Sequence, residues 1–480
     1  MVVVGFIKLC VISSEMPRPR QVEPAAIALR FQVGGPQPAQ ALATALRVDR
    51  SSISRALALP ALAPQVVRLG TTRGATYALR RPVRGLGDSF PIRCVDAEGR
   101  VRDWAELVTL HGGWQLNWAE PDRAPAWAAE WLGLGGFTDG FPFFLGEARP
   151  QGYLGRAVGR ALSPTLNLPA DLRNWSDDDT LVYLQAEGDD LPGDLIVGDA
   201  PLRRAQERAL NPPRPLSEAE RTERYPALAA ASIGSGTPGS SVEGEQPKFL
   251  VTLGAGAAVT PVIVKFTDVI STPTGRRWAD LLAAESQALA LLHAHGEAHA
   301  APRLLDAAGR RFLETPRYDR MGARGRRGVV SLRALHEAFG GPDPNTWPVA
   351  VANLHARGLI DAATLRSVRL RHAFGTLIGN SDMHFGNLAF FLGDTLPLRL
   401  APGYDMLPMR WAPTPGQATP APTFAPAPPL PVELSEWNEA AAWATEFWAR
   451  VSGDVRVSAE FAGHARAAGA QVARMREVFG

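Results

Sequence analysis

A short polar segment between two apolar runs constrains this chain more than any other stretch of it. Residues 379–387 read Gly-Asn-Ser-Asp-Met-His-Phe-Gly-Asn, and mostly apolar residues enclose them on both sides. Within the segment four residues separate Asp382 from Asn387, and a second acid, Asp405, follows further along the chain. Apolar flanks predict that the segment begins and ends in packed structure. We therefore expect its polar side chains to lie at the edge of a core.

The order Asp, four residues, Asn and then a further Asp is the order in which protein kinases present their base and metal ligands. Phosphoryl transfer requires a neutralised triphosphate, fixed metal ions and an oriented hydroxyl. In this interpretation Asp382 accepts the hydroxyl proton, Asn387 binds one Mg²⁺, and Asp405 joins a metal to the phosphates. The sequence thus predicts a kinase-like phosphotransferase that uses ATP and Mg²⁺.

Two other interpretations of the segment remain open. His384 and Asp382 could belong to a zinc site or a hydrolase, but the chain has no further histidine at ligand spacing and no nucleophile motif. Small-molecule phosphotransferases of the aminoglycoside-kinase type share an Asp-x-x-x-x-Asn loop, so they form a third class.

Lysine usage points to a phosphate site upstream of this segment. Of 50 basic residues only three are lysines, namely Lys8, Lys248 and Lys265, and arginine is a poor substitute for a compact ammonium on a phosphate. Lys265 lies in the strand-like run 262–266, where alternation places it opposite its apolar neighbours. Glu285, on a predicted helix over 278–293, is the expected ion-pair partner of Lys265, unless it is a solvated helix residue.

A glycine- and serine-rich segment, residues 232–248, precedes this strand. Such a loop can direct backbone N–H groups at phosphate oxygens, although it can equally be a flexible linker. Residues 311–320 read as a strand that enters a hinge between two lobes. Residues 331–377 read as helical with one break at 340–342, the proline-rich run 413–431 as loop or extended chain, and 434–479 as amphipathic helices.

The N-terminal part of the chain predicts a winged helix-turn-helix. Residues 24–46 are helical with a break at 34–36, a turn at 47–49 leads to a second helix at 50–57, and a hairpin with its turn at 71–74 follows. Such a unit would place the second helix in the major groove of DNA and the wing along the phosphates. A small helical interaction domain with exposed arginines is the alternative. The predicted DNA-binding residues are Arg50, Ser51, Ser54, Arg55, Arg68 and Arg73.

Residues 85–230 are less informative. A hairpin is expected at 88–101, and the tryptophans between 104 and 131 are expected in a core rather than on a ligand platform. The acidic triplet 177–179 is expected to cap a helix or to solvate a loop. Residues 212–224 are expected to form a linker.

Taken together, these motifs resemble the HipA family of bacterial serine/threonine kinases, the toxins of type II toxin–antitoxin modules. The resemblance rests on 241–248, Lys265, 317–320, 379–387 and 404–405. The N-terminal helix-turn-helix and the motif Asn-Ser-Asp-Met-His resemble those of the YjjJ (HipH) branch. The resemblance implies an α+β, two-lobed protein-kinase-like fold, preceded here by the winged helix-turn-helix and a small β-containing subdomain. It also implies that Ser241 is autophosphorylated as an off-switch, and that the ATP-binding residues are Val242, Glu243, Gly244, Glu245, Gln246, Pro247, Lys248, Lys265, Glu285, Arg317 and Tyr318.

The predicted domains are a disordered extension at 1–20, the winged helix-turn-helix at 21–84, a HipA-like N-terminal subdomain and linker at 85–230, a kinase N-lobe at 231–325 and a helical C-lobe at 326–480. The predicted function is a HipA-type protein kinase with a fused DNA-binding domain; the alternative is a DNA-binding regulator whose kinase domain only senses nucleotide. Expected partners are a protein substrate, for which the resemblance suggests an aminoacyl-tRNA synthetase, DNA, and a separate antitoxin.

Composition fits this interpretation. A net charge of +2 argues against a protein that coats polyanions, and two cysteines provide no disulfide framework, which fits a reducing cytosol. Residues 1–15 are too short and interrupted to span a bilayer, so we expect a cytoplasmic protein without a membrane segment.

Overall fold

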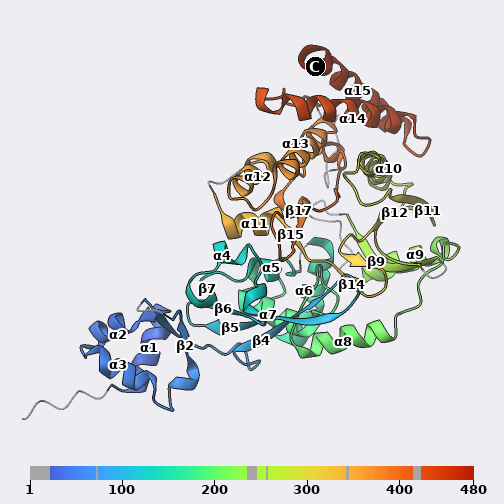
Figure 1. Cartoon of the computed structure of the whole chain (residues 1–480). Coiled ribbons are helices and arrows are strands. Elements are labelled where there is room, and N and C mark those ends of the chain that lie inside the picture. Colours follow the sequence, from blue (N-terminus) through green and yellow to red (C-terminus); the bar gives the residue numbers. More distant parts are fainter. Residues whose placement is uncertain are drawn as a thin grey trace, which may run out of the picture.

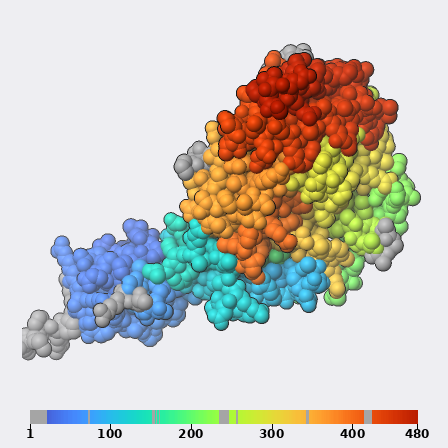
Figure 2. Space-filling view, turned by 45° about the horizontal axis from the view of Figure 1, so that its top comes forward, coloured from blue at the N-terminus to red at the C-terminus, as the bar shows by residue number. Residues whose placement is uncertain are grey.

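The protein consists of an N-terminal domain, a middle domain and two further lobes, as seen in a computed structural model that describes residues 22–71, 74–150, 152–234, 246–255, 258–341, 345–413 and 423–480. The N-terminal domain, blue in Figure 2, projects from one side of the body formed by the rest of the chain. The predicted extension at 1–20 lies outside the described residues. In the described part of the chain, no helix is long and apolar enough to cross a membrane.

The N-terminal domain combines three helices with a three-stranded sheet. A three-residue turn at 47–49 separates the second helix from the third, and the Asp49 carboxylate accepts the Ser52 N–H at 2.8 Å, which caps the third helix as expected. Ile27, Phe31 and Ile53 are fully buried between the helices. The elements are α1 (Pro24–Gly34), β1 (Gln37–Pro38), α2 (Ala39–Leu46), α3 (Arg50–Leu57), β2 (Val66–Leu69) and β3 (Thr76–Leu79), with the strand order β1-β3-β2.

The middle domain is built on a five-stranded sheet with the order β7-β6-β5-β4-β8. The predicted hairpin is formed by β4 and β5, and the tryptophans lie in the core as expected, with Trp127 only 1% exposed. Ser176 and Asp179 form a capping box at the start of α7, so the acidic triplet caps a helix. The elements are β4 (Ser89–Val95), β5 (Val101–Leu110), β6 (Gly113–Trp118), α4 (Ala128–Trp131), β7 (Phe137–Thr138), α5 (Phe143–Gly146), α6 (Gly152–Leu166), α7 (Asp177–Glu187), β8 (Leu195–Val197) and α8 (Asp199–Leu210).

The next lobe has a four-stranded antiparallel sheet with a helix on each face (Figure 1). One of these helices, α9 (Arg221–Gly234), begins where a linker was expected and continues through the predicted domain boundary at 231. Tyr225 of α9 is fully buried and its ring packs against Phe249 and Phe312, because the apolar face of this sheet needs a cover. The other elements are β9 (Lys248–Ala255), β10 (Ala258–Phe266), α10 (Pro273–Ala294), β11 (Arg303–Ala307) and β12 (Arg310–Pro316), with the order β11-β12-β10-β9.

The last lobe is mainly helical. The predicted helical stretch 331–377 breaks twice rather than once: the second break follows α12, where Gly358 has a φ of +73° and Asp361 then caps α13. The described part of the proline-rich run contains no strand and no α-helix. The elements are β13 (Arg320–Met321), β14 (Gly325–Arg326), β15 (Val329–Ser331), α11 (Leu332–Phe339), α12 (Trp347–Ala356), α13 (Ala362–Leu377), β16 (Ala389–Phe391), β17 (Arg399–Leu400), α14 (Leu434–Gly453) and α15 (Ala459–Phe479).

Candidate active site

Lys265 joins the two lobes at a buried ion-pair triad. On β10, Val264 and Phe266 face the core under α9, so alternation directs Lys265 to the opposite face. Its Nζ lies 2.5 Å from Glu285 Oε1 of α10 and also donates to Asp405 Oδ1. The predicted pair of Lys265 and Glu285 is therefore present, and Asp405 joins it from the other lobe.

The charges of this triad depend on one another. Burial raises the pKa of Glu285 above its ordinary value, although the nearby Lys265 ammonium opposes the rise. Burial would also raise the pKa of Asp405, but the charge of Lys265 more than offsets it and lowers that pKa to about 2. Burial would lower the pKa of Lys265, whereas the charges of Asp405 and Glu285 raise it. At neutral pH the site therefore holds an ammonium beside the ionised Asp405.

The polar segment 379–387 is held to Asp405 by its own amide groups. The Asn380 Nδ2 donates to the Asp405 carbonyl at 3.1 Å, and its Oδ1 accepts the Asp382 N–H at 3.0 Å. The Asn387 Nδ2 donates to the Asp382 carbonyl at 2.7 Å. Asp382 itself is exposed. These bonds bring the three predicted catalytic residues into one hydrogen-bonded unit, and Asn380 is a connecting residue to which the sequence assigned no role.

Asn387 and Asp405 have donor atoms of the kind that bind a magnesium ion. Since the Asn387 Nδ2 is bonded to a carbonyl, the amide Oδ1 is the atom left for a cation. A carboxylate and an amide oxygen are hard ligands of the kind that Mg²⁺ prefers, and Mg²⁺ usually takes its remaining ligands from water and substrate phosphates.

His384 has a structural role in this loop. Its Nδ1 accepts the Gly386 N–H at 3.0 Å, and its carbonyl accepts the Trp347 Nε1–H at 3.1 Å. Across the described ranges, no three His, Cys, Asp or Glu side chains are grouped so that they could hold a metal ion. The zinc interpretation therefore has no support from the geometry.

Two tyrosines lie between the triad and the polar segment. The Tyr404 hydroxyl donates to the Gly386 carbonyl at 2.7 Å. Its ring stacks on Tyr318, with a centroid distance of 5.8 Å and an interplanar angle of 28°. Tyr318 is thus close to Tyr404 and the polar segment. The Arg317 guanidinium bonds to Asp319 and lies near Asp190 of the middle domain.

The described end of the glycine-rich segment lies beside the triad. Lys248 pairs with Lys265 across β9 and β10, so two of the three lysines are cross-strand neighbours. The Gln246 Nε2 donates to the Phe266 carbonyl at 2.5 Å, and the Pro247 carbonyl accepts the Phe266 N–H at 3.0 Å. The predicted residues Ser241, Val242, Glu243, Gly244 and Glu245 lie outside the described residues.

The predicted DNA-binding residues lie on the surface of the N-terminal domain. Arg50, Ser51, Ser54 and Arg55 are exposed on α3, and Arg68 is exposed on β2, where its Nη2 donates to the Thr71 carbonyl at 2.9 Å. Arg73 lies outside the described residues.

Two protein-family models match the chain. The model described as YjjJ-like toxin, middle domain, matches residues 86–206, and the model described as HipA-like C-terminal domain matches residues 240–476. Among known proteins, Toxin YjjJ of Escherichia coli (strain K12) is 35% identical over 433 residues, which cover 89% of this chain and 93% of that protein.

Two solved structures are also similar. HipA of Shewanella oneidensis MR-1, solved in a toxin–antitoxin complex with HipB and operator DNA, is 16% identical with a TM-score of 0.49, over 81% of this chain and 97% of that chain. The proinflammatory kinase CtkA of Helicobacter pylori is 12% identical with a TM-score of 0.30, over 48% of this chain and 90% of that chain.

Proposed function

Because this chain belongs to the YjjJ-like toxins of the HipA family, we propose that it is an ATP- and Mg²⁺-dependent serine/threonine protein kinase. The observation that carries the proposal is the triad in which Lys265 of one lobe contacts both Glu285 and Asp405. A lysine and a glutamate paired in this way, next to an acidic metal ligand, are parts that kinases assemble for phosphoryl transfer.

In the proposed reaction each residue acts on charge or on a proton. Lys265 neutralises phosphate charge, and Asp382 takes the proton of the attacking serine or threonine hydroxyl. Asn387 and Asp405 would hold Mg²⁺, which supplies positive charge to the triphosphate. The hydrogen bonds through Asn380 keep Asp382 and Asp405 at fixed positions relative to each other, so little reorganisation is needed when substrate binds.

Autophosphorylation of Ser241 is the proposed off-switch. A phosphate near Lys248 would compete with the triphosphate for the same positive charge. Lys248 lowers the pKa of Asp405 through its charge, which supports a position close to the site. The physiological substrate and a cytoplasmic location stay predictions.

Phosphoproteomics tests the proposed activity. Cells that express the wild type should contain phosphoserine or phosphothreonine sites that are absent from cells expressing Asp382→Ala at the same level. Identical phosphorylation patterns in the two cultures would refute a protein kinase.

A second proposed function is DNA binding by the N-terminal domain, either as self-repression or as the main role of a nucleotide-sensing regulator. Its support is the exposure of Arg50 and Arg55 on α3, the second helix of the pair joined by the short turn. The full-length protein should bind its own promoter DNA with an affinity that falls steeply as salt rises. Salt-independent binding, or none, would refute this function.

A further inference from the structure

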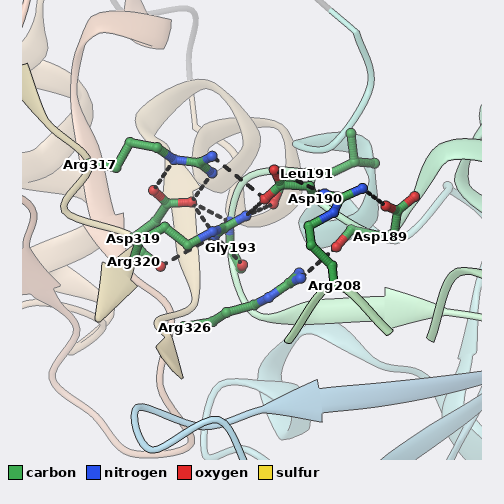
Figure 3. A network of polar contacts seen from close by, with 9 residues as sticks. All are labelled: Asp189, Asp190, Leu191, Gly193, Arg208, Arg317, Asp319, Arg320 and Arg326. Carbon is green, nitrogen blue, oxygen red and sulfur yellow. Dashed lines mark hydrogen bonds and ion pairs between the residues drawn. The ribbon is translucent and has the colours of Figure 1, made fainter. Parts of the chain in front are cut away.

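A loop of the middle domain, residues 189–193, contacts the segment that joins the two lobes. The Asp319 carboxylate accepts two bonds from Arg317, at 3.0 and 2.8 Å, and one from Arg320 at 2.6 Å. It also accepts the Gly193 N–H at 3.1 Å. Arg320 in turn donates to the Asp190 carboxylate at 2.9 Å and to the Gly193 carbonyl at 3.0 Å (Figure 3). A single carboxylate therefore holds both arginines and the loop together.

The centre of this network, formed by Asp319 and Arg317, is buried, whereas Asp190 at its edge is exposed. Asp319 is 6% exposed and Arg317 is 9% exposed. Burial alone would raise the pKa of Asp319, but Arg317 and Arg320 lower it, so the carboxylate is ionised at neutral pH. Removing one partner from such a network leaves an uncompensated buried charge.

The middle domain has a second contact, with the strand and helix that support the polar segment. Glu147, which follows α5, accepts the Ser331 N–H at 3.0 Å and the Ser331 hydroxyl at 2.6 Å. Ser331 caps α11 and pairs with Ala389 of β16, the strand that leaves the polar segment. Glu147 therefore supports β16, the strand that begins shortly after Asn387.

Tyr318 and Tyr404 connect the first of these contacts to the polar segment. Tyr318 is flanked in sequence by the two anchored residues Arg317 and Asp319, and its ring stacks on Tyr404. Tyr404 bonds to Gly386 in the polar segment and directly precedes Asp405. Through Tyr318 and Tyr404, the middle domain is therefore connected to Gly386 in the polar segment and to Asp405.

We infer that Asp319 and Glu147 are positioning residues. Through Asp319 the middle domain fixes Tyr318 and Tyr404, and through Glu147 it fixes the start of β16, so that both residues help to set the relative positions of Asp382 and Asp405. The inference rests on the proposed kinase function for its kinetic consequence. A misplacement of about 1 Å at a reacting group can lower a rate by about 100-fold. The middle domain is then a part of the active site's framework, not only a neighbour of it.

Kinetics of full-length variants test the inference. Asp319→Asn should lower kcat by about 10- to 100-fold with a smaller change in KM for ATP. Asp306→Asn is the control for the loss of a paired Asp–Arg contact. Asp306 on β11 accepts two bonds from Arg311, at 2.7 and 2.8 Å, although its side chain is more exposed than that of Asp319. Glu147→Ala should lower kcat, and Glu147→Gln, which keeps an acceptor oxygen for Ser331, should restore most of it.

Hydrogen exchange separates this inference from the proposed function. In Asp319→Asn the amides of 384–388 should exchange faster than in the wild type, while Asp382→Ala and Asp306→Asn should leave that segment unchanged. If the wild type transfers no phosphate but the exchange result holds, the kinase proposal fails and the positioning role stands. Equal kcat and equal exchange in Asp319→Asn and Asp306→Asn would overturn the positioning role.

Discussion

Replacing Lys265 by methionine should destabilise the protein in a pH-dependent way. Methionine keeps most of the apolar stem but removes the ammonium, whose Nζ lies 2.5 Å from Glu285 Oε1 and also contacts Asp405. The Glu285 side chain is 1% exposed, and its Oε2 has no hydrogen-bond partner among the described residues. Breaking a buried ion pair from one side costs about 3–5 kcal/mol, and this is the loss expected at high pH.

The loss should shrink as the pH falls. Burial already raises the pKa of Glu285, and removing Lys265 removes the charge that opposes the rise. The folded variant then holds a proton on Glu285 more tightly than the unfolded chain, whose glutamate pKa is about 4.3. Its free energy of unfolding therefore falls as pH rises from that value to the folded pKa, by up to about 1.4 kcal/mol per pH unit. In the wild type the Lys265 charge keeps the pKa of Asp405 at about 2, against the effect of burial. The variant lacks that charge, so the pKa of Asp405 also rises and Asp405 contributes to the pH dependence in the same direction as Glu285.

Differential scanning calorimetry of the full-length protein measures the effect. The gap in Tm between wild type and Lys265→Met should be wider at about pH 8 than at about pH 5.5. The triple variant Lys265→Met with Glu285→Gln and Asp405→Asn is the control, and the Tm gap between it and the wild type should vary much less with pH. A gap that is the same at both pH values, or no gap at all, would contradict the assignment of a buried, charge-coupled triad.

Three further predictions concern separate parts of the molecule. Asp382→Ala should lower phosphoryl transfer by at least about 100-fold while calorimetric ATP affinity changes little; a parallel loss of affinity would argue against a base. Arg50→Ala should reduce the slope of log affinity for DNA against log salt by about one, whereas Arg450→Ala on α14 should not; equal slopes would remove α3 from the interface. Trp127→Ala should cost about 3–5 kcal/mol of unfolding free energy, because the ring is buried and its Nε1–H donates to the Gly393 carbonyl at 3.1 Å; a loss under about 1 kcal/mol would contradict its place in the core.

The sequence predicted those features of the fold and the site that depend on residues close together in the chain. Strand alternation oriented Lys265 correctly, and the position of Glu285 on the helix that follows this strand predicted the ion pair between them. The capping role of Asp49 followed in the same way from its position before α3. Such features depend on residues close in sequence, so the sequence contains them in full.

The features that the sequence did not predict depend on contacts between residues far apart in the chain. The expected linker is partly helix α9, because its apolar face covers a sheet formed by later residues. The bonds of Arg317 and Gly193 to Asp319 were not predicted, because Gly193 lies 126 residues away from Asp319 in the chain. Nothing within a local window identifies such a partner. The break after α12 does have a local signal, because Gly358 there has a φ of +73°.

The most direct test of the central claim is transfer of the γ-phosphate in vitro. Full-length wild type and Asp382→Ala are incubated with Mg²⁺ and ATP labelled on the γ-phosphate, and the labelled peptide is identified by mass spectrometry. The proposed mechanism predicts label on Ser241 of the wild type and none on the Asp382→Ala variant. No label on the wild type, or equal label on both proteins, would contradict it.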